Sequence, residues 1–370
     1  SLFVVPKFMV NKDGSLGARN DVHCVSIEHK MGIKASPTAV LQYGDHGGAT
    51  GFLVGQENRG LEYMFIMMNA ARYAVGVQGI AIAERAYQKA VGYAKDRVQS
   101  RPVDGSMSAA APIIHHPDVK RMLMTMRAST EGCRAMASVA AAAYDAAHHH
   151  ADAEVRKQNA AFYEFLVPLV KGYSTEMSLE VTSLGVQVHG GMGFIEETGA
   201  AQYYRDAKIL TIYEGTTAIQ ANDLVGRKTA RDGGATAKAI AAQIAVTEAE
   251  LAAGSAQAQA VAKRLKAARE AFIEVVDFIA ANTRSNPNAA FAGSVPYLML
   301  AGNLMAGWQL GRALLVAESL SAQGQDAAFM QSKITTARFY ADHILSRAPG
   351  IRDAIVEGAE AVTALTADAF

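Results

Sequence analysis

The sequence has little cysteine and no net charge. Its 370 residues include only two cysteines, Cys24 and Cys133, which are far apart in the chain and lack metal-ligand spacing. A disulfide framework and a cysteine-based zinc site are therefore not indicated, and a reducing cytoplasm fits this usage. The 35 basic and 35 acidic residues cancel, so no basic field attracts nucleic acid or anionic lipid. We predict a cytoplasmic protein with no nucleic-acid partner.

Long apolar runs and a targeting signal are also missing. The longest charge-poor stretch, Val295–Gly311, contains Pro296, Asn303 and Gln309 and is short for a membrane span, so it predicts a buried helix. The first residues, Ser1–Pro6, lack an initiator Met and the pattern of a signal peptide, and they read like the middle of a strand. We predict no membrane span, and we expect the sequence to begin inside a larger protein.

Half of the residues are apolar, which is enough for more than one packing unit. Short β-type runs occur at Phe3–Val5, Val22–Ile27 and Ala39–Tyr43. They predict a small antiparallel β unit over residues 1–60, incomplete as it stands. From residue 61 the spacing of apolar residues is helical. The glycine turn after Arg231 predicts a boundary between a helical domain at 61–232 and an additional helical extension at 233–370.

The fold class that follows is mainly α, a helical bundle with a partial β domain before it and an extra helical domain after it. Expected helices are about 61–98, 116–149, 152–190, 215–231, 236–283, 294–322 and 326–347. The alanine-rich stretches inside them predict closely packed helices rather than linkers.

Two histidine clusters invite a metal hypothesis, His148–His150 and His115–His116. Consecutive positions on a helix point to different faces and do not chelate one ion as an i, i+4 pair does. An exposed helix end explains the longer cluster, and we predict no metal site.

One region combines features that suit catalysis. The glycine run Gly190–Gly193 ends a predicted helix and lets backbone approach a ligand. Farther on, Glu214 follows an apolar segment and precedes Gly215 and Thr216, which would cap the next helix. Two interpretations stay open from the residues alone. Glu214 is a general base in an apolar pocket beside a phosphate-binding helix start, or the loop is ordinary and its carboxylate is solvated.

Three motifs in order then point to a family. They are Gln187-x-x-Gly-Gly-x-Gly-Phe, Arg205-Asp-Ala-Lys-Ile and Ile212-Tyr-Glu-Gly-Thr. In this the sequence resembles the acyl-CoA dehydrogenase family of flavoproteins. The runs 47–61 and 69–79 resemble the last strands of that family's middle β domain and the first helix of its C-terminal domain, so the resemblance covers about residues 1–230.

The resemblance implies an activity and a base. FAD-dependent members convert an acyl-CoA thioester to trans-2-enoyl-CoA, and Glu214 matches the glutamate that removes the α-proton while the flavin takes the β-hydride. Asn69, Arg72 and Gly215 match the substrate-contact positions. Asn69 stands where an Asp is common.

The resemblance also implies a set of residues that bind FAD. These are Arg97, Gln99, Gln187, Gly190, Gly191 and Thr216. Arg97 matches a pyrophosphate contact that a neighbouring subunit usually supplies. Ala218 replaces a Gln often used at that position, so one hydrogen bond to the cofactor is not expected here.

Other expectations follow from the same family. A homodimer or homotetramer is implied, as is electron-transfer flavoprotein as the electron acceptor. The long extension resembles a bacterial subgroup with long-chain or broad-range acyl-CoA dehydrogenases and 3-methylmercaptopropionyl-CoA dehydrogenase. Two alternatives remain: an acyl-CoA oxidase, and a DNA-associated flavoprotein of the same fold, which the mixed charges of 235–283 disfavour.

Overall fold

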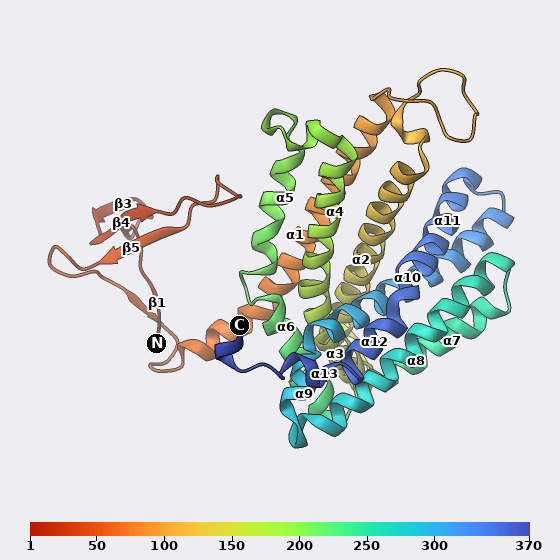
Figure 1. Cartoon of the computed structure of the whole chain (residues 1–370). Helices are drawn as coiled ribbons and strands as arrows, with labels where there is room; N and C mark the ends of the chain where they lie inside the picture. Colours follow the sequence, from red (N-terminus) through yellow and green to blue (C-terminus); the bar gives the residue numbers. More distant parts are fainter. The chain divides into compact units, whose positions relative to one another are not determined.

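A computed structural model describes residues 1–370 and divides them between two units, Ser1–Ala71 and Arg72–Phe370. The strands of the first unit are β1 (Leu2–Val4), β2 (Phe8–Val10), β3 (Leu16–Arg19), β4 (Val22–Ile27), β5 (Ala39–Tyr43) and β6 (Phe52–Val54). They form three antiparallel pairs, β1 with β6, β2 with β3 and β4 with β5 (Figure 1). The three predicted β runs are confirmed as β1, β4 and β5. Strand β6 lies in the run 47–61 that resembles the last strands of the family's middle β domain. Strands β2 and β3, only three and four residues long, were not predicted.

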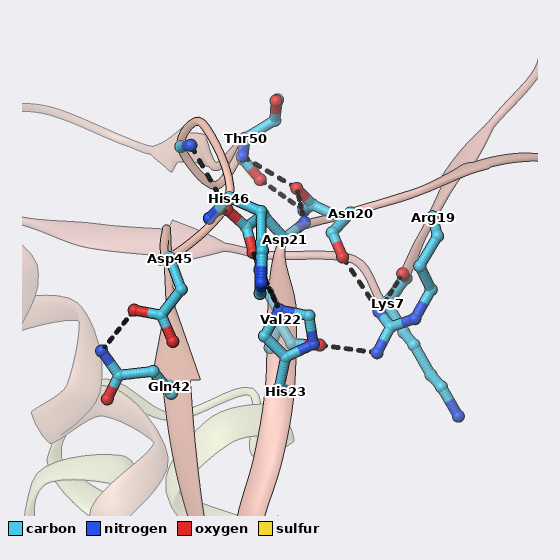
Figure 2. Close-up of polar contacts among 11 residues, drawn as sticks. Lys7, Arg19, Asn20, Asp21, Val22, His23, Gln42, Asp45, His46 and Thr50 are labelled. Carbon is cyan, nitrogen blue, oxygen red and sulfur yellow. Dashed lines mark hydrogen bonds and ion pairs between the residues drawn. The ribbon is translucent and has the colours of Figure 1, made fainter.

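The side chain of Asn20 ties the connections of the β unit together. Its amide nitrogen donates to the carbonyl oxygens of Pro6 and Thr50, at 2.9 and 2.8 Å, and its oxygen accepts from the backbone N–H of Thr50. Figure 2 shows the contacts of Asn20 with Thr50, next to Asp21, which precedes β4. The loop after β5 is therefore fixed to the residue that precedes β4.

Helices make up most of the chain, which confirms the predicted mainly α fold. They are α1 (Gly60–Asp96), α2 (Pro117–His149), α3 (Ala153–Pro168), α4 (Ser174–His189), α5 (Ala200–Lys208), α6 (Thr217–Asp223), α7 (Ala235–Ala252), α8 (Ala256–Ser285), α9 (Pro287–Ala292), α10 (Ser294–Ala322), α11 (Ala327–His343), α12 (Ala348–Val356) and α13 (Ala359–Val362).

Three expected helices differ from the structure. The segment 236–283 is not one helix, because Gly254 interrupts it and Ser255 caps α8 by accepting a hydrogen bond from the N–H of Ala258. The segment 152–190 contains a π-helical turn, η2 (Leu169–Tyr173), between α3 and α4. The segment 215–231 continues from α6 into a second π-helical turn, η6 (Leu224–Thr229). The short helices α5, α9, α12 and α13 were not predicted. The predicted domain division at 232/233 stays a prediction.

Within the second unit, α1 and α4 run side by side in the same direction (Figure 1). A Cβ at Gly76 would clash with the carbonyl oxygen of Val170, and one at Gly79 would lie 3.0 Å from that of Ser174. Farther along, Gly185 of α4 lies against Ala86. These glycines let two helix backbones approach closely, so the start of α4 and η2 are pressed against the first half of α1.

The C-terminal helices pack on the same π-helical turn. Gly302 of α10 contacts the ring of Tyr173, and the Tyr173 hydroxyl donates to Asn303 Oδ1 at 2.8 Å. The hydroxyl of Tyr340, on α11, lies 3.0 Å from that of Tyr173 and donates to the Asn303 carbonyl oxygen. All three side chains are buried. The stretch Val295–Gly311 is part of α10 and mostly buried, as predicted.

One helix, α1, is long and apolar enough to cross a membrane by length and composition alone. Of its apolar window, 28% is buried, and one such helix is weak evidence for a span. The expected absence of a membrane span stays a prediction. The two cysteines are both unpaired, Cys24 exposed and Cys133 buried. Burial raises the pKa of the Cys133 thiol to about 12, which keeps it protonated and unreactive.

Candidate active site

Glu214 lies in a turn between the 3-10 turn η5 (Ile209–Thr211) and α6. Its side chain is half-buried, and its backbone has a positive φ of 54°. Gly215 follows with a φ of 89°. A non-glycine residue with positive φ is strained and persists only where its surroundings hold it. The backbone of the candidate base is therefore held in place by other residues.

The side chain of Lys171 is the strongest of these restraints. It is fully buried in η2, and its Nζ donates to the carbonyl oxygens of Leu210 and Gly215, at 2.9 and 2.6 Å. The two acceptors flank Glu214 in sequence, so one ammonium group holds both sides of the turn. Burial lowers the pKa of Lys171 to about 8, while the negative charges of Glu176 and Glu214 act in the opposite direction.

Further hydrogen bonds anchor the turn to α1 and α4. The Tyr213 hydroxyl donates to Gln78 Oε1 at 2.5 Å, and the Thr217 hydroxyl donates to Glu176 Oε1 at 2.5 Å. The Thr216 hydroxyl accepts from the N–H of Ile219 and caps α6, as its sequence position suggested. The turn is thus tied at both ends and in its middle to helices of the core.

Arg72 is the only arginine buried in this region, and it is incompletely paired. Its Nη1 lies 3.7 Å from Asp223 Oδ2, and its Nε is buried without a hydrogen-bond partner. Gln220 Oε1, on α6, is a second buried polar atom without a partner. Buried polar atoms are nearly always satisfied, so these two stand out beside the turn, as do Thr130 Oγ1 and Ser174 Oγ elsewhere in the bundle. The positive charge of Arg72 also lowers the pKa of Lys171, which places Arg72 and Glu214 around the same ammonium group.

The remaining predicted cofactor residues lie at the other end of α1. The segment with Arg97 and Gln99 follows α1 and pairs with residues 111–113, through the N–H of Gln99 to the Ala111 carbonyl and the N–H of Ile113 to the Arg97 carbonyl. The ring of His189, at the end of α4, stacks on Tyr93 with centroids 4.3 Å apart. The loop with Gln187, Gly190 and Gly191 is thereby brought to the same end of the bundle.

In this second group, the backbone of the glycine loop is accessible to a ligand. Gly190 has a φ of 58°, and a Cβ at Gly190 or Gly191 would meet no atom within 4 Å. Gln187 and Arg97 are exposed, and no carboxylate pairs with Arg97. Open glycine backbone and an unpaired cation suit the adenosine and pyrophosphate parts of a dinucleotide.

The predicted residues therefore form two groups rather than one. Arg72, Gly215 and Thr216 gather around Glu214, whereas the glycine loop lies at the far end of α1. The turn with Glu214 contacts α1 at Gln78 and the helix end before the glycine loop contacts it at Tyr93, and a helix rises about 22 Å between these two positions. Asn69 is exposed on α1 in the first unit, and its predicted substrate contact stays a prediction.

Sequence reasoning missed Lys171, which has the clearest structural role at the site. A signal was present: Lys171 is the single charged residue in the apolar run Phe165–Tyr173. A charge within such a run is buried only where a partner meets it. The partners are backbone carbonyls of a distant turn, which no sequence motif reveals.

Comparison with known proteins agrees with this fold. Residues 58–229 match the family model of the acyl-CoA dehydrogenase C-terminal domain, and residues 236–366 match the model "Acetyl-CoA dehydrogenase C-terminal like". The chain belongs to the acyl-CoA dehydrogenase family.

Two of the similar proteins carry the names of enzymes in the subgroup that the sequence resembles. The chain is 60% identical over 345 residues to 3-methylmercaptopropionyl-CoA dehydrogenase of Ruegeria pomeroyi, covering 93% of this chain and 58% of that protein. It is 36% identical over 377 residues to the broad-specificity linear acyl-CoA dehydrogenase FadE5 of Mycobacterium tuberculosis, covering 96% and 60%. The chain thus spans less than two thirds of the length of these relatives.

A solved structure shares the fold. The crystal structure of an acyl-CoA dehydrogenase complexed with FAD from Bacillus anthracis has a TM-score of 0.70 at 21% identity, covering 94% of this chain and 58% of that chain. Caenorhabditis elegans ACDH-11 in complex with C11-CoA has a TM-score of 0.67 at 19% identity, covering 94% and 59%. At these identities the likeness concerns the fold.

Proposed function

We propose that the protein is an FAD-dependent acyl-CoA dehydrogenase in which Glu214 is the catalytic base. In the reaction the α C–H bond breaks and its proton passes to the Glu214 carboxylate, while the β C–H bond breaks with its electron pair. The α and β carbons become a trans double bond. FAD, when bound, accepts the β-hydride. The observation that carries this proposal is the strained backbone of Glu214, held by Lys171 beside the incompletely paired Arg72.

The chain's own residues orient the base in this scheme. Lys171 and Tyr213 keep the turn in one conformation, so the carboxylate meets the α carbon without a search through other positions. The guanidinium of Arg72, whose Nε has no partner within the chain, would face polar atoms of the substrate near Gly215. Half-burial of Glu214 limits competition from water for the proton.

The separation of the two residue groups supports an oligomer. Because the Glu214 turn contacts α1 at Gln78 and the glycine loop follows the contact at Tyr93, each FAD would bind the Glu214 end of one subunit and Arg97, Gln99, Gln187, Gly190 and Gly191 of its neighbour. A homodimer or homotetramer meets this requirement. We expect electron-transfer flavoprotein to reoxidise the cofactor and the enzyme to work in the cytoplasm.

The substrate proposal rests on the relatives. The relative of 60% identity is named for 3-methylmercaptopropionyl-CoA, a short acyl chain with a thioether. We therefore propose a short-chain acyl-CoA and expect 3-methylmercaptopropionyl-CoA to be preferred over straight chains of greater length.

The test uses the complete gene product. Under anaerobic conditions, addition of acyl-CoA should bleach the flavin, and Glu214→Gln should slow this by about 10²- to 10⁴-fold, the usual contribution of a general base. Glu197→Gln is the matched control, because Glu197 is exposed on the turn Glu196–Thr198. Bleaching of Glu214→Gln at the native rate would refute the assignment.

Two further measurements address the alternatives. Fast oxygen consumption by the substrate-reduced enzyme would indicate an acyl-CoA oxidase. A salt-dependent gel shift with duplex DNA would indicate the DNA-associated flavoprotein.

A further inference from the structure

Three potential metal ligands converge in the β unit, and none of them is among the residues predicted for catalysis or cofactor binding. Asp21 precedes β4, His23 lies in β4, and His46 lies in the turn after β5. The antiparallel register pairs Val22 with Tyr43, so the turn that follows β5 returns beside the start of β4. The histidines are 23 residues apart in sequence, and only this register brings them together.

The three atoms that could bind a metal ion, one from each of these side chains, form a small triangle (Figure 2). His23 Nε2 lies 2.9 Å from Asp21 Oδ1, His46 Nδ1 lies 3.4 Å from the same oxygen, and the two ring nitrogens are 3.2 Å apart. A neutral imidazole has one N–H, and an ionised carboxylate has none. If both facing nitrogens carry protons, the protons repel each other. If one is bare, its lone pair faces the carboxylate oxygen. Whichever nitrogens carry protons, at least one pair of these three atoms therefore repels instead of forming a hydrogen bond.

A metal ion removes this conflict, and the triangle has the right size for one. Neighbouring ligands on an ion with bonds of about 2.1 Å are about 3.0–3.4 Å apart. An ion at that distance from all three atoms would lie about 1 Å out of their plane. Two imidazole nitrogens and one carboxylate oxygen suit zinc and related divalent transition metals.

The surroundings prepare Asp21 to be a ligand. Its second oxygen, Oδ2, accepts hydrogen bonds from the backbone N–H groups of His46, at 2.6 Å, and Gly48, at 3.3 Å. These bonds fix the carboxylate and leave Oδ1 facing the histidines, as outer partners do at metal sites.

We propose that Asp21, His23 and His46 form a three-ligand site for a divalent transition metal ion, with Zn²⁺ as the expected ion and water in the remaining positions. The ion would cross-link the turn after β5 to the start of β4. Asn20 already joins the same two segments through Thr50, so the ion would bind to a pre-formed site. This proposal is independent of the proposed function and stands or falls separately from it.

The test uses the full chain, stripped with a chelator and titrated with ZnCl₂ alone. Calorimetry and elemental analysis should give one saturable equivalent of zinc, and His46→Gln should weaken it by about tenfold or more because one of three ligands is lost. The His46 side chain is 75% exposed, so its replacement leaves the fold intact. His23→Gln is the second variant, and His149→Gln, on an exposed helix end, is the matched control.

Two results would overturn the proposal. One is the absence of saturable binding at one equivalent. The other is binding that survives His46→Gln and His23→Gln but falls in His149→Gln, which would assign the zinc to the helix-end histidines. With Co²⁺ in place of zinc, visible absorption bands lost in His46→Gln would give independent support.

Discussion

The side-chain nitrogen of Lys171 lies 2.6 Å from the carbonyl oxygen of Gly215, the residue that follows the proposed base. The same nitrogen reaches Leu210, four residues before Glu214. The buried ammonium group of Lys171 thus donates to two backbone carbonyl oxygens of the turn, which would otherwise need water as their partner. Because the turn is strained at Glu214, this contact determines where the carboxylate lies.

Replacing Lys171 by Met should therefore affect both stability and catalysis. Two buried carbonyl oxygens would lose their donor, which should lower the free energy of unfolding by about 2 kcal/mol or more. The rate of flavin bleaching should fall by about tenfold or more, because the base loses its position. Urea unfolding and stopped-flow bleaching measure these effects, with exposed Lys208→Met as control. A native bleaching rate in a folded Lys171→Met protein would contradict the positioning role.

The lowered pKa of Lys171 predicts a pH dependence of stability. The pKa is about 8 in the folded chain and 10.5 for the ordinary group, so the unfolded state binds more protons between these values. The free energy of unfolding should therefore rise with pH from about 8 to 10.5. Buried tyrosines such as Tyr340, with a raised pKa, act in the opposite direction above pH 10. The difference between wild type and Lys171→Met, measured by urea titration at each pH, isolates the lysine contribution. An unchanged difference across this range would refute it.

Close packing of α1 on the π-helical turn η2 can be tested with two glycines of one helix. Gly76→Ala places a Cβ against the Val170 carbonyl oxygen and should destabilise the fold by about 2 kcal/mol or more. Gly92→Ala places a Cβ in open space on the same helix and should stabilise it by up to about 1 kcal/mol. Thermal or urea unfolding distinguishes them. Equal effects of the two substitutions would mean that α1 and η2 are not in close contact.

The buried contact between Tyr173 and Tyr340 links the turn η2 to the C-terminal helices. Tyr340→Phe should lower the free energy of unfolding by about 1–2 kcal/mol, because the Asn303 carbonyl oxygen loses the donor it has there. The exposed Tyr204→Phe should stay within about 0.5 kcal/mol of wild type. A double-mutant cycle with Tyr173→Phe measures the coupling, and additive effects would show that the two hydroxyls do not interact.

The sequence predicted those parts of the candidate site that depend on a short local motif. The Ile212–Thr217 motif located the turn, and the cap at Thr216 and the left-handed Gly190 have the expected local roles. Helix boundaries were predicted well where a glycine or proline marks them and poorly inside the alanine-rich 236–283. There, Gly254 and Ser255 were a stop and a cap that the strong helix propensity concealed.

What could not be predicted depends on contacts between distant segments. Lys171 meets carbonyls some 40 residues away, at separations of 39 and 44 positions, and the π-helical turn that aims it has no sequence signature. The convergence of Asp21 and His46 depends on the register of β4 and β5, which a one-residue slip would abolish. Likewise, only the parallel packing of α1 and α4 shows that the base and the glycine loop belong to opposite ends of the bundle.

The length of α1 between these two ends has a genetic consequence. If each active site takes its base from one subunit and its glycine loop from another, two differently inactivated chains complement each other. A chain with Glu214→Gln and a chain with a bulky residue at Gly191 are each inactive as homo-oligomers. Mixed dimers of the two contain one site with both defects and one site with neither. Co-expression should therefore restore bleaching, with up to half of the sites active in each mixed dimer.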